Sequence, residues 1–158
     1  MKIFYLIVLV FYSLISLECN SQSKMNESDK FLSWLLKNRE EKIICTSPAE
    51  ISMSKFNQIK NEFTFSEKDS LSIQKKIMEN KKAVFHKSLS PDKSFLDKIE
   101  IGNTFLKISQ PIFFDDGRKV LIYIEHHCGI ECGEGSIEVY EIKKLGYTLL
   151  YKAEIWES

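Results

Sequence analysis

The sequence predicts an α+β domain, in which N-terminal helices pack on a C-terminal antiparallel β-meander of about four strands. Two observations predict this fold class. In the first half of the chain, apolar residues recur every three or four positions, which is the spacing of an amphipathic helix. From about residue 112 onward they alternate with polar residues, and short turn signals separate the runs. Helices followed by such strands form an α+β arrangement.

The first 21 residues are predicted to be a signal peptide that takes no part in the fold. After Lys2, 13 of the 15 residues in the range 3–17 are apolar. A membrane-spanning helix needs about 20 such residues, so this run has the length of a signal-peptide core instead. Cys19 follows the run directly and is the candidate for lipidation, although Glu18 stands where a lipoprotein signal normally has a small residue. Two alternatives stay open: a lipoprotein signal that ends at Cys19, and cleavage to a soluble secreted form.

The rest of the chain is expected to be a flexible tether over residues 22–28 and a single α+β domain over residues 29–158. The expected location is outside the cytoplasm: the periplasm, the outer membrane as a lipoprotein, or the medium as a secreted protein. The membrane is then contacted only through a lipid anchor at Cys19. The 22 basic and 22 acidic residues give a net charge of zero, which argues against nucleic acid as a partner.

Helices are expected at three places in the first half. The first helix begins at Ser28 or Asp29, and the second covers about residues 53–63. The third covers residues 67–80, after a capping box of Ser66 and Asp69, with one apolar face of Leu71, Gln74, Ile77 and Met78. Residues 43–45 are either a short strand or a helix end, and Ser90-Pro91 resembles another helix start.

Four strands are expected in the second half, over residues 112–114, 119–128, 136–143 and 147–156. Asp115-Asp116-Gly117 is a turn signal between the first two, because glycine readily adopts a positive φ. Since side chains alternate between the two faces of a strand, His126 and His127 are expected on opposite faces. Short turns between consecutive strands imply the antiparallel meander.

The segment 126–135 is the most unusual in the sequence, because it holds two histidines, two cysteines and three glycines. Glycines at this density indicate that the backbone turns sharply or lies close to another group. The first interpretation is a disulfide between Cys128 and Cys132, which an oxidising compartment favours. Cys45 is then left over, and a bridge from Cys45 to either of the two is an open alternative.

A second interpretation of this segment is a metal site made from His126, His127, Cys128 and Cys132, since these residue types bind zinc and copper. The spacing is not that of a structural zinc site, which usually has two separated clusters. A third interpretation, thiol redox chemistry, lacks the usual Cys-x-x-Cys at a helix start. No catalytic residue and no cofactor are assigned, because none of the familiar hydrolase, phosphate-binding or dinucleotide-binding motifs is present.

The C-terminal third carries a resemblance to a known group of proteins. The residues are Ser109-Gln110-Pro111-Ile112-Phe113-Phe114-Asp115-Asp116, the aliphatic run 120–124, Cys128-x-x-x-Cys132-Gly133-x-Gly135, and the closing Ile155-Trp156-x-Ser158. This pattern resembles small exported proteins of unknown function from Bacteroidetes-type bacteria, which share a Cys-Gly hairpin and a terminal Trp-x-Ser. Tyr147 stands where those proteins often have tryptophan. The resemblance implies no activity, cofactor or catalytic residue.

The sequence therefore favours a non-enzymatic exported module that binds an envelope or extracellular protein or glycan. One alternative is a metal-dependent or hydrolytic envelope enzyme that uses the region of His126, His127 and Cys128, with Glu125 or Glu131 nearby. That alternative requires these side chains to converge on one cavity. Another alternative is an inhibitor or immunity protein.

Overall fold

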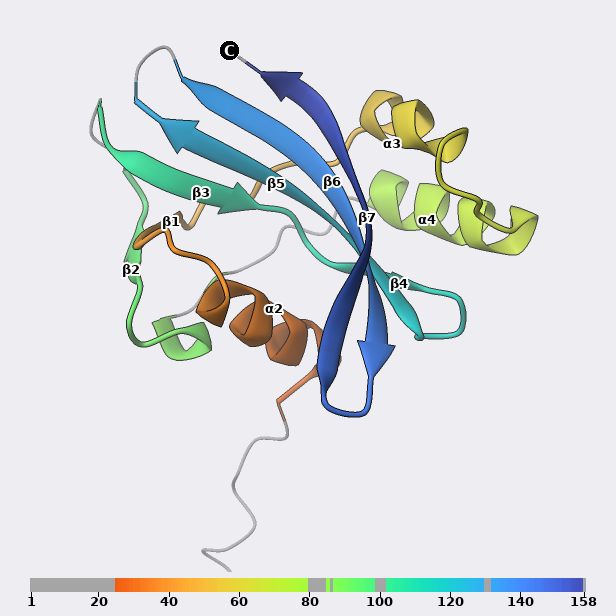
Figure 1. The fold of residues 1–158 in the computed structure, drawn as a ribbon, viewed down its shortest axis with the longest axis horizontal. Coiled ribbons are helices and arrows are strands. Elements are labelled where there is room, and N and C mark those ends of the chain that lie inside the picture. The colour runs from red at the N-terminus through yellow and green to blue at the C-terminus, as the bar shows by residue number, and fades with distance from the viewer. Residues whose placement is uncertain (1–24, 80–84, 86, 99–101, 130–131, 158) are drawn as a thin grey trace, which may run out of the picture.

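The computed structural model describes residues 25–79, 85, 87–98, 102–129 and 132–157 (Figure 1). Within these residues, three α-helices and one 3-10 helix pack on a mixed sheet of seven strands. The α+β class is confirmed, with the helices in the N-terminal half and the long strands at the C-terminal end. The predicted number of about four strands was too low, because three further short strands, earlier in the sequence, also belong to the sheet.

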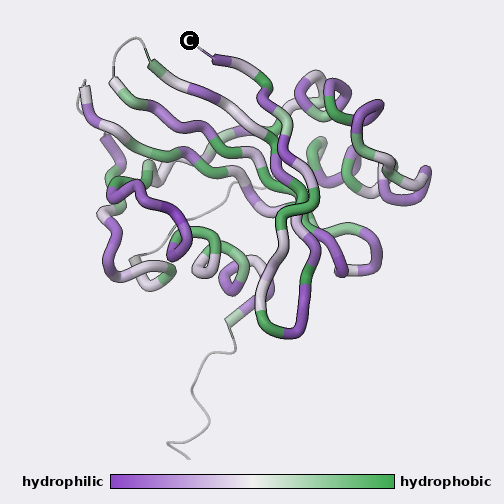
Figure 2. The backbone as a smooth tube through the Cα atoms, viewed as in Figure 1, coloured by the Kyte–Doolittle hydropathy of each residue, from purple (hydrophilic) through white to green (hydrophobic). Residues whose placement is uncertain are grey.

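The sheet is built around three long strands that form the expected antiparallel meander. These are β5 (Lys119–Cys128), β6 (Gly133–Lys143) and β7 (Gly146–Glu157). The complete order is β2-β1-β3-β5-β6-β7, and β4 also pairs with β5. Figure 2 shows hydrophobic residues gathered in the middle of the sheet, where residues 120–124 of β5 are buried on both faces.

The part of the sheet on the other edge of β5 contains the short strands β1 (Ile43–Cys45), β2 (Ser94–Leu96) and β3 (Thr104–Ile108). Residues 43–45 are thus a strand, the first of the two alternatives in the sequence, and β1 pairs in parallel with both β2 and β3. Ser90-Pro91 starts no helix: a 3-10 turn, η1 (Lys87–Leu89), precedes it and β2 follows after a turn. Only Asp92 and Lys93 separate Pro91 from β2, which leaves no room for a helix.

β3 and β4 (Ile112–Phe114) lie end to end along the same edge of β5. Pro111 between them has no N–H to donate to the sheet. Ser109 keeps the interrupted part of the ladder closed, since its N–H donates to the carbonyl of Tyr123 and its hydroxyl accepts from the Tyr123 N–H, both at 2.9 Å. This junction fixes the centre of β5, where Tyr123 is fully buried.

The helix α2 (Glu27–Lys37) covers one face of the sheet. Its N-cap is Asn26, whose side chain accepts from the Asp29 N–H, so the predicted start at Ser28 or Asp29 was wrong. The helix begins at Glu27 and includes the end of the predicted tether. Its buried face packs on the even-numbered residues of β5. The members of this first core are Phe31, Leu32, Leu35, Leu36, Ile44, Phe85, Leu89, Leu106, Ile108, Val120, Ile122, Ile124 and Tyr140.

The helices α3 (Met53–Lys60) and α4 (Glu67–Glu79) cover the opposite face, so the sheet has helices on both sides. Their core includes Phe56, Ile59 and Ile73 against Leu121, Tyr123, Ile137 and Val139. The predicted face of α4 was wrong in part. Ser70 and Ile73 are buried, whereas Leu71 is 60% and Met78 71% exposed. The helix approaches the sheet along the stripe of residues 70, 73 and 77, and Leu71 and Met78 lie outside it.

Candidate functional site

The two adjacent histidines of β5 lie on opposite faces of the sheet. The Nε2 atom of His126 is 3.8 Å from a carboxylate oxygen of Glu41, on the side that α2 covers. His127 instead stacks on Phe105 of β3, with ring centroids 4.5 Å apart and an angle of 8° between the planes. The alternation expected from the sequence is thus observed, and the two side chains do not converge on one site.

The cysteines of the hairpin lie together, as the first interpretation of this segment expects. Cys128 and Cys132 are at disulfide distance, with their Cα atoms 5.0 Å apart, and the Cys128 N–H donates to the carbonyl of Cys132. Cys45 is buried in β1 and is not bonded to either, so the two alternative bridges are wrong. A disulfide sulfur is a poor metal ligand, and in the described part of the chain no three His, Cys, Asp or Glu side chains are grouped to hold a metal ion. Cys19 and Glu131 lie outside the described residues.

The glycines of the hairpin lie against Trp156, near the C-terminal end of β7. A Cβ atom at Gly135 would come within 2.6 Å of both Cδ1 of Trp156 and the hydroxyl oxygen of Tyr123. At Gly133 it would lie 3.0 Å from Cη2 at the other end of the same indole. Both rings of the indole therefore rest on the backbone of β6, and the opposite face of the indole points away from that strand. The close approach that the glycine content predicted is thus with Trp156.

Tyr123 fixes the orientation of this indole. The Nε1 atom of Trp156 donates to the Tyr123 hydroxyl at 2.6 Å. Burial raises the pKa of Tyr123 to about 12, although the bond from Trp156 acts in the opposite direction. The phenol consequently stays neutral at physiological pH and accepts the indole N–H in one fixed geometry.

Charged side chains border the aromatic rings. The Nζ atom of Lys55, from α3, lies 3.8 Å from the centre of the Tyr123 ring and 3.7 Å from a carboxylate oxygen of Glu125. The other carboxylate oxygen of Glu125 is 3.3 Å from Nε2 of His127. Burial lowers the pKa of the Lys55 ammonium, and the charge of Glu125 counteracts only part of that effect. We call the whole group the Trp156 surface: Lys55, Phe105, Tyr123, Glu125, His127 and Trp156.

The Trp156 surface lies at the end of the sheet where the C-terminal end of β7 and the β5–β6 connection are neighbours (Figure 1). Phe105, His127 and Trp156 are all partly exposed there. Neither Phe105 nor Trp156 belongs to either hydrophobic core. Trp34, by contrast, packs on the first core between Phe31, Tyr140 and Tyr147. The position of Trp156 is therefore not explained by core packing.

A second polar group lies on the α2 face and is more deeply buried. Arg39 donates to Glu138 at 2.5 Å, and Tyr140 donates to the same carboxylate oxygen. Burial lowers the pKa of the Arg39 guanidinium, but the charge of Glu138 and the hydrogen bonds to Glu138 and Tyr140 together raise that pKa above its ordinary value. Lys93 donates to the backbone carbonyls of Arg39 and Glu41, at 2.5 and 2.8 Å, and holds this segment in place. All of these groups are satisfied by one another, which is the arrangement of a structural network.

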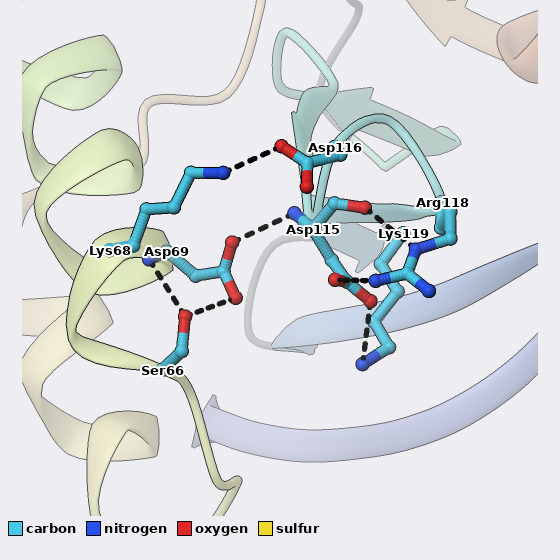
Figure 3. Close-up of polar contacts among 7 residues, drawn as sticks. All are labelled: Ser66, Lys68, Asp69, Asp115, Asp116, Arg118 and Lys119. Atoms are coloured by element: carbon cyan, nitrogen blue, oxygen red, sulfur yellow. Dashed lines mark hydrogen bonds and ion pairs between the residues drawn. The ribbon is translucent and has the colours of Figure 1, made fainter.

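The acidic turn between β4 and β5 is also engaged in contacts within the protein (Figure 3). Asp115 is paired with Arg118 and Lys119, and Asp116 with Lys68 of α4. The Ser66 cap predicted at the start of α4 is present, since the Asp69 N–H donates to the Ser66 hydroxyl; the Asp69 carboxylate accepts from that hydroxyl and not from the Ser66 N–H, as it would in a complete capping box. The other oxygen of Asp69 accepts from the Asp115 N–H at 2.8 Å. These carboxylates join α4 to the turn and leave no free pair for catalysis.

The sequence pointed to Glu125, His127, Trp156 and the glycines of this region, but not to Lys55, Phe105 or Tyr123 as members of the Trp156 surface. Lys55, Phe105 and Tyr123 are far from the hairpin in the sequence, and no local pattern marks them. One signal was present: the resemblance singled out both the Cys-Gly hairpin and the terminal Trp-x-Ser. The two motifs are in contact in the folded chain, because Trp156 packs on the two glycines.

Comparison with protein-family models, with curated proteins and with solved structures found no match to this chain. The resemblance to exported Bacteroidetes-type proteins therefore stays a prediction. Within the residues that the structure describes, no helix is long and apolar enough to cross a membrane.

Proposed function

We propose that this chain is an exported, non-enzymatic binding module, and that its Trp156 surface is the place where it binds an envelope or extracellular partner. The observation that carries the proposal is the placement of the Trp156 indole on Gly133 and Gly135, outside both cores. Export rests on the apolar N-terminal segment and on the cysteine pair in the hairpin.

The geometry supports recognition because the aromatic side chains are held in place before any partner arrives. Trp156 is fixed by its contact with two glycines and by the hydrogen bond to Tyr123, and the ring of His127 is fixed against Phe105. A side chain that is already ordered loses little conformational entropy on binding. Tryptophan and tyrosine also contribute a large share of the binding energy at interfaces.

Contacts within the protein hold the polar side chains of this surface in place. Lys55 lies 3.7 Å from one carboxylate oxygen of Glu125, and the other oxygen lies 3.3 Å from Nε2 of His127. These polar groups, like the aromatic rings, are therefore positioned before any partner arrives.

Recovery of partners from the native envelope tests this proposal. The tagged full-length chain is expressed in the cell that produces it, crosslinked, and isolated from the envelope and the medium. Partners recovered with the wild type are expected to be lost with Trp156→Ala and with Phe105→Ala. Leu149→Ala is the matched control, because Leu149 lies on the same strand, is 47% exposed and is remote from the Trp156 surface.

Circular dichroism and thermal unfolding establish that each variant is folded. Equal recovery of the same partners with all four proteins would contradict the proposed surface. Retention of the wild-type chain in the cytoplasm would contradict export.

A further inference from the structure

We infer that the ligand of the Trp156 surface is a carbohydrate, more specifically a β-linked saccharide of gluco-configured pyranose units. This inference rests on the proposed function and names the substrate class of the same surface. It follows from the partly exposed indole, from the polar groups that border it, and from the local balance of charge.

The indole of Trp156 is partly exposed, and its contact with Gly133 and Gly135 covers the side that lies on β6. The face of an aromatic ring is electron-rich and attracts groups with partial positive charge. In a β-gluco-configured pyranose the hydroxyl groups are equatorial, so each ring face consists of polarised C–H bonds. Such a sugar ring is flat, has about the size of the indole and stacks on it without leaving a hydroxyl unsolvated.

Groups that can bind sugar hydroxyls lie beside this face. Lys55 is a donor that also binds the carbonyl of Glu50 at 3.0 Å, Glu125 is an acceptor, and the imidazole of His127 supplies either function. A hydroxyl both donates and accepts, so adjacent donors and acceptors match it better than a cluster of one kind. Glu125 lies between the other two groups: its carboxylate is 3.7 Å from Nζ of Lys55 and 3.3 Å from Nε2 of His127.

The charge of the surface argues against an anionic ligand. Lys55 and Glu125 have opposite charges, and the neighbour of Glu125 across the strands, Lys107, adds a single positive charge at the border. Phosphorylated or acidic peptides are typically bound by clusters of arginine. Both arginines of the chain are elsewhere, since Arg39 pairs with Glu138 and Arg118 with Asp115.

The small apolar area argues for a sugar rather than a folded protein. A stable protein interface buries about 800 Å² on each partner around an apolar centre. On this surface, Phe105 and Trp156 are separated by His127 and are bordered by charged side chains. A single stacking position surrounded by polar groups is instead the arrangement that one sugar unit requires.

Titration of the exported protein with cellohexaose and with N-acetylchitohexaose tests the inference. Isothermal titration calorimetry is expected to give saturable binding to at least one of the two. Trp156→Ala is expected to weaken that binding by about tenfold or more, the effect of losing an aromatic hot spot, while Leu149→Ala leaves it unchanged. In the Trp34→Phe background, Trp156 is the single tryptophan of the chain, and its fluorescence is expected to change on binding.

Each outcome decides between the two levels of the proposal. Absence of binding to both saccharides, with envelope partners that still depend on Trp156, would overturn the carbohydrate inference and leave a protein as the partner. Saccharide binding that Trp156→Ala does not weaken would overturn the inference as well. If Trp156→Ala weakens neither the recovery of envelope partners nor saccharide binding, both the inference and the proposed function are overturned.

Discussion

Replacement of Arg39 by methionine is expected to lower the free energy of unfolding by about 3–5 kcal/mol. Methionine keeps most of the side-chain volume but removes the positive charge that faces Glu138. The Glu138 side chain is only 2% exposed and lies in the middle of β6, so water replaces little of the interaction that Arg39 provides. A buried charge left without its partner is far more costly than the net contribution of the intact pair. Chemical denaturation followed by circular dichroism measures the loss.

The chain supplies a matched control in its other arginine. Arg118 pairs with Asp115 at 2.5 Å, the same distance as between Arg39 and Glu138, but the Arg118 side chain is 71% exposed. Arg118→Met is expected to leave stability nearly unchanged, because exposed pairs contribute little. The double variant Arg39→Met with Glu138→Leu is expected to recover most of the loss, since it removes the unpaired charge. If Arg39→Met and Arg118→Met lowered the free energy of unfolding equally, burial of Glu138 would not be the cause of the loss.

The substitution Gly135→Ala is expected to destabilise the protein by about 2–4 kcal/mol, from overpacking together with a broken buried hydrogen bond. The added methyl group would lie 2.6 Å from the Tyr123 hydroxyl and from Cδ1 of Trp156. Tyr123 is fully buried between the sheet and α3, so the indole has to move. The fluorescence of Trp156 in the Trp34→Phe background is expected to shift toward that of an indole in water.

The neighbouring glycine gives a graded comparison for this variant. At Gly133 the nearest indole atom is 3.0 Å from the added Cβ, so Gly133→Ala is expected to cost less than Gly135→Ala. The double variant Gly135→Ala with Trp156→Ala is expected to recover part of the stability, because one of the two collisions is gone. If Gly135→Ala were as stable as the wild type, the indole could not lie where the structure places it.

Long periodic elements were predictable from the sequence. The continuous apolar run 120–124 located β5, and alternating residues located β6 and β7, each within a few residues. Ser66 caps α4 at the position that the sequence predicted. Short elements were not predictable to the same degree. β1 and β2 have three residues each, too few to show a period, and their parallel pairing depends on contacts far along the chain.

The candidate site was predictable only in part, for a related reason. The glycines of the hairpin indicate a close approach but not the group that approaches, because Trp156 reaches them through the pairing of β6 with β7. Lys55 reaches the surface through the packing of α3 on the sheet, which depends on the whole second core. The exposed face of α4 shows the same limit, since Leu71 and Ile73 are equally apolar in the sequence and only the sheet decides which one is buried.

The proposed function depends on one geometry, in which the indole of Trp156 lies against Gly133 and Gly135 and donates to the Tyr123 hydroxyl. Proton NMR of the folded protein tests this geometry most directly. The account predicts that the Hα resonances of both glycines are shifted upfield by the aromatic ring, that both show nuclear Overhauser contacts with indole protons, and that the indole N–H exchanges slowly. Glycine Hα resonances at their ordinary positions, together with an indole N–H that exchanges as fast as in an unfolded chain, would contradict it.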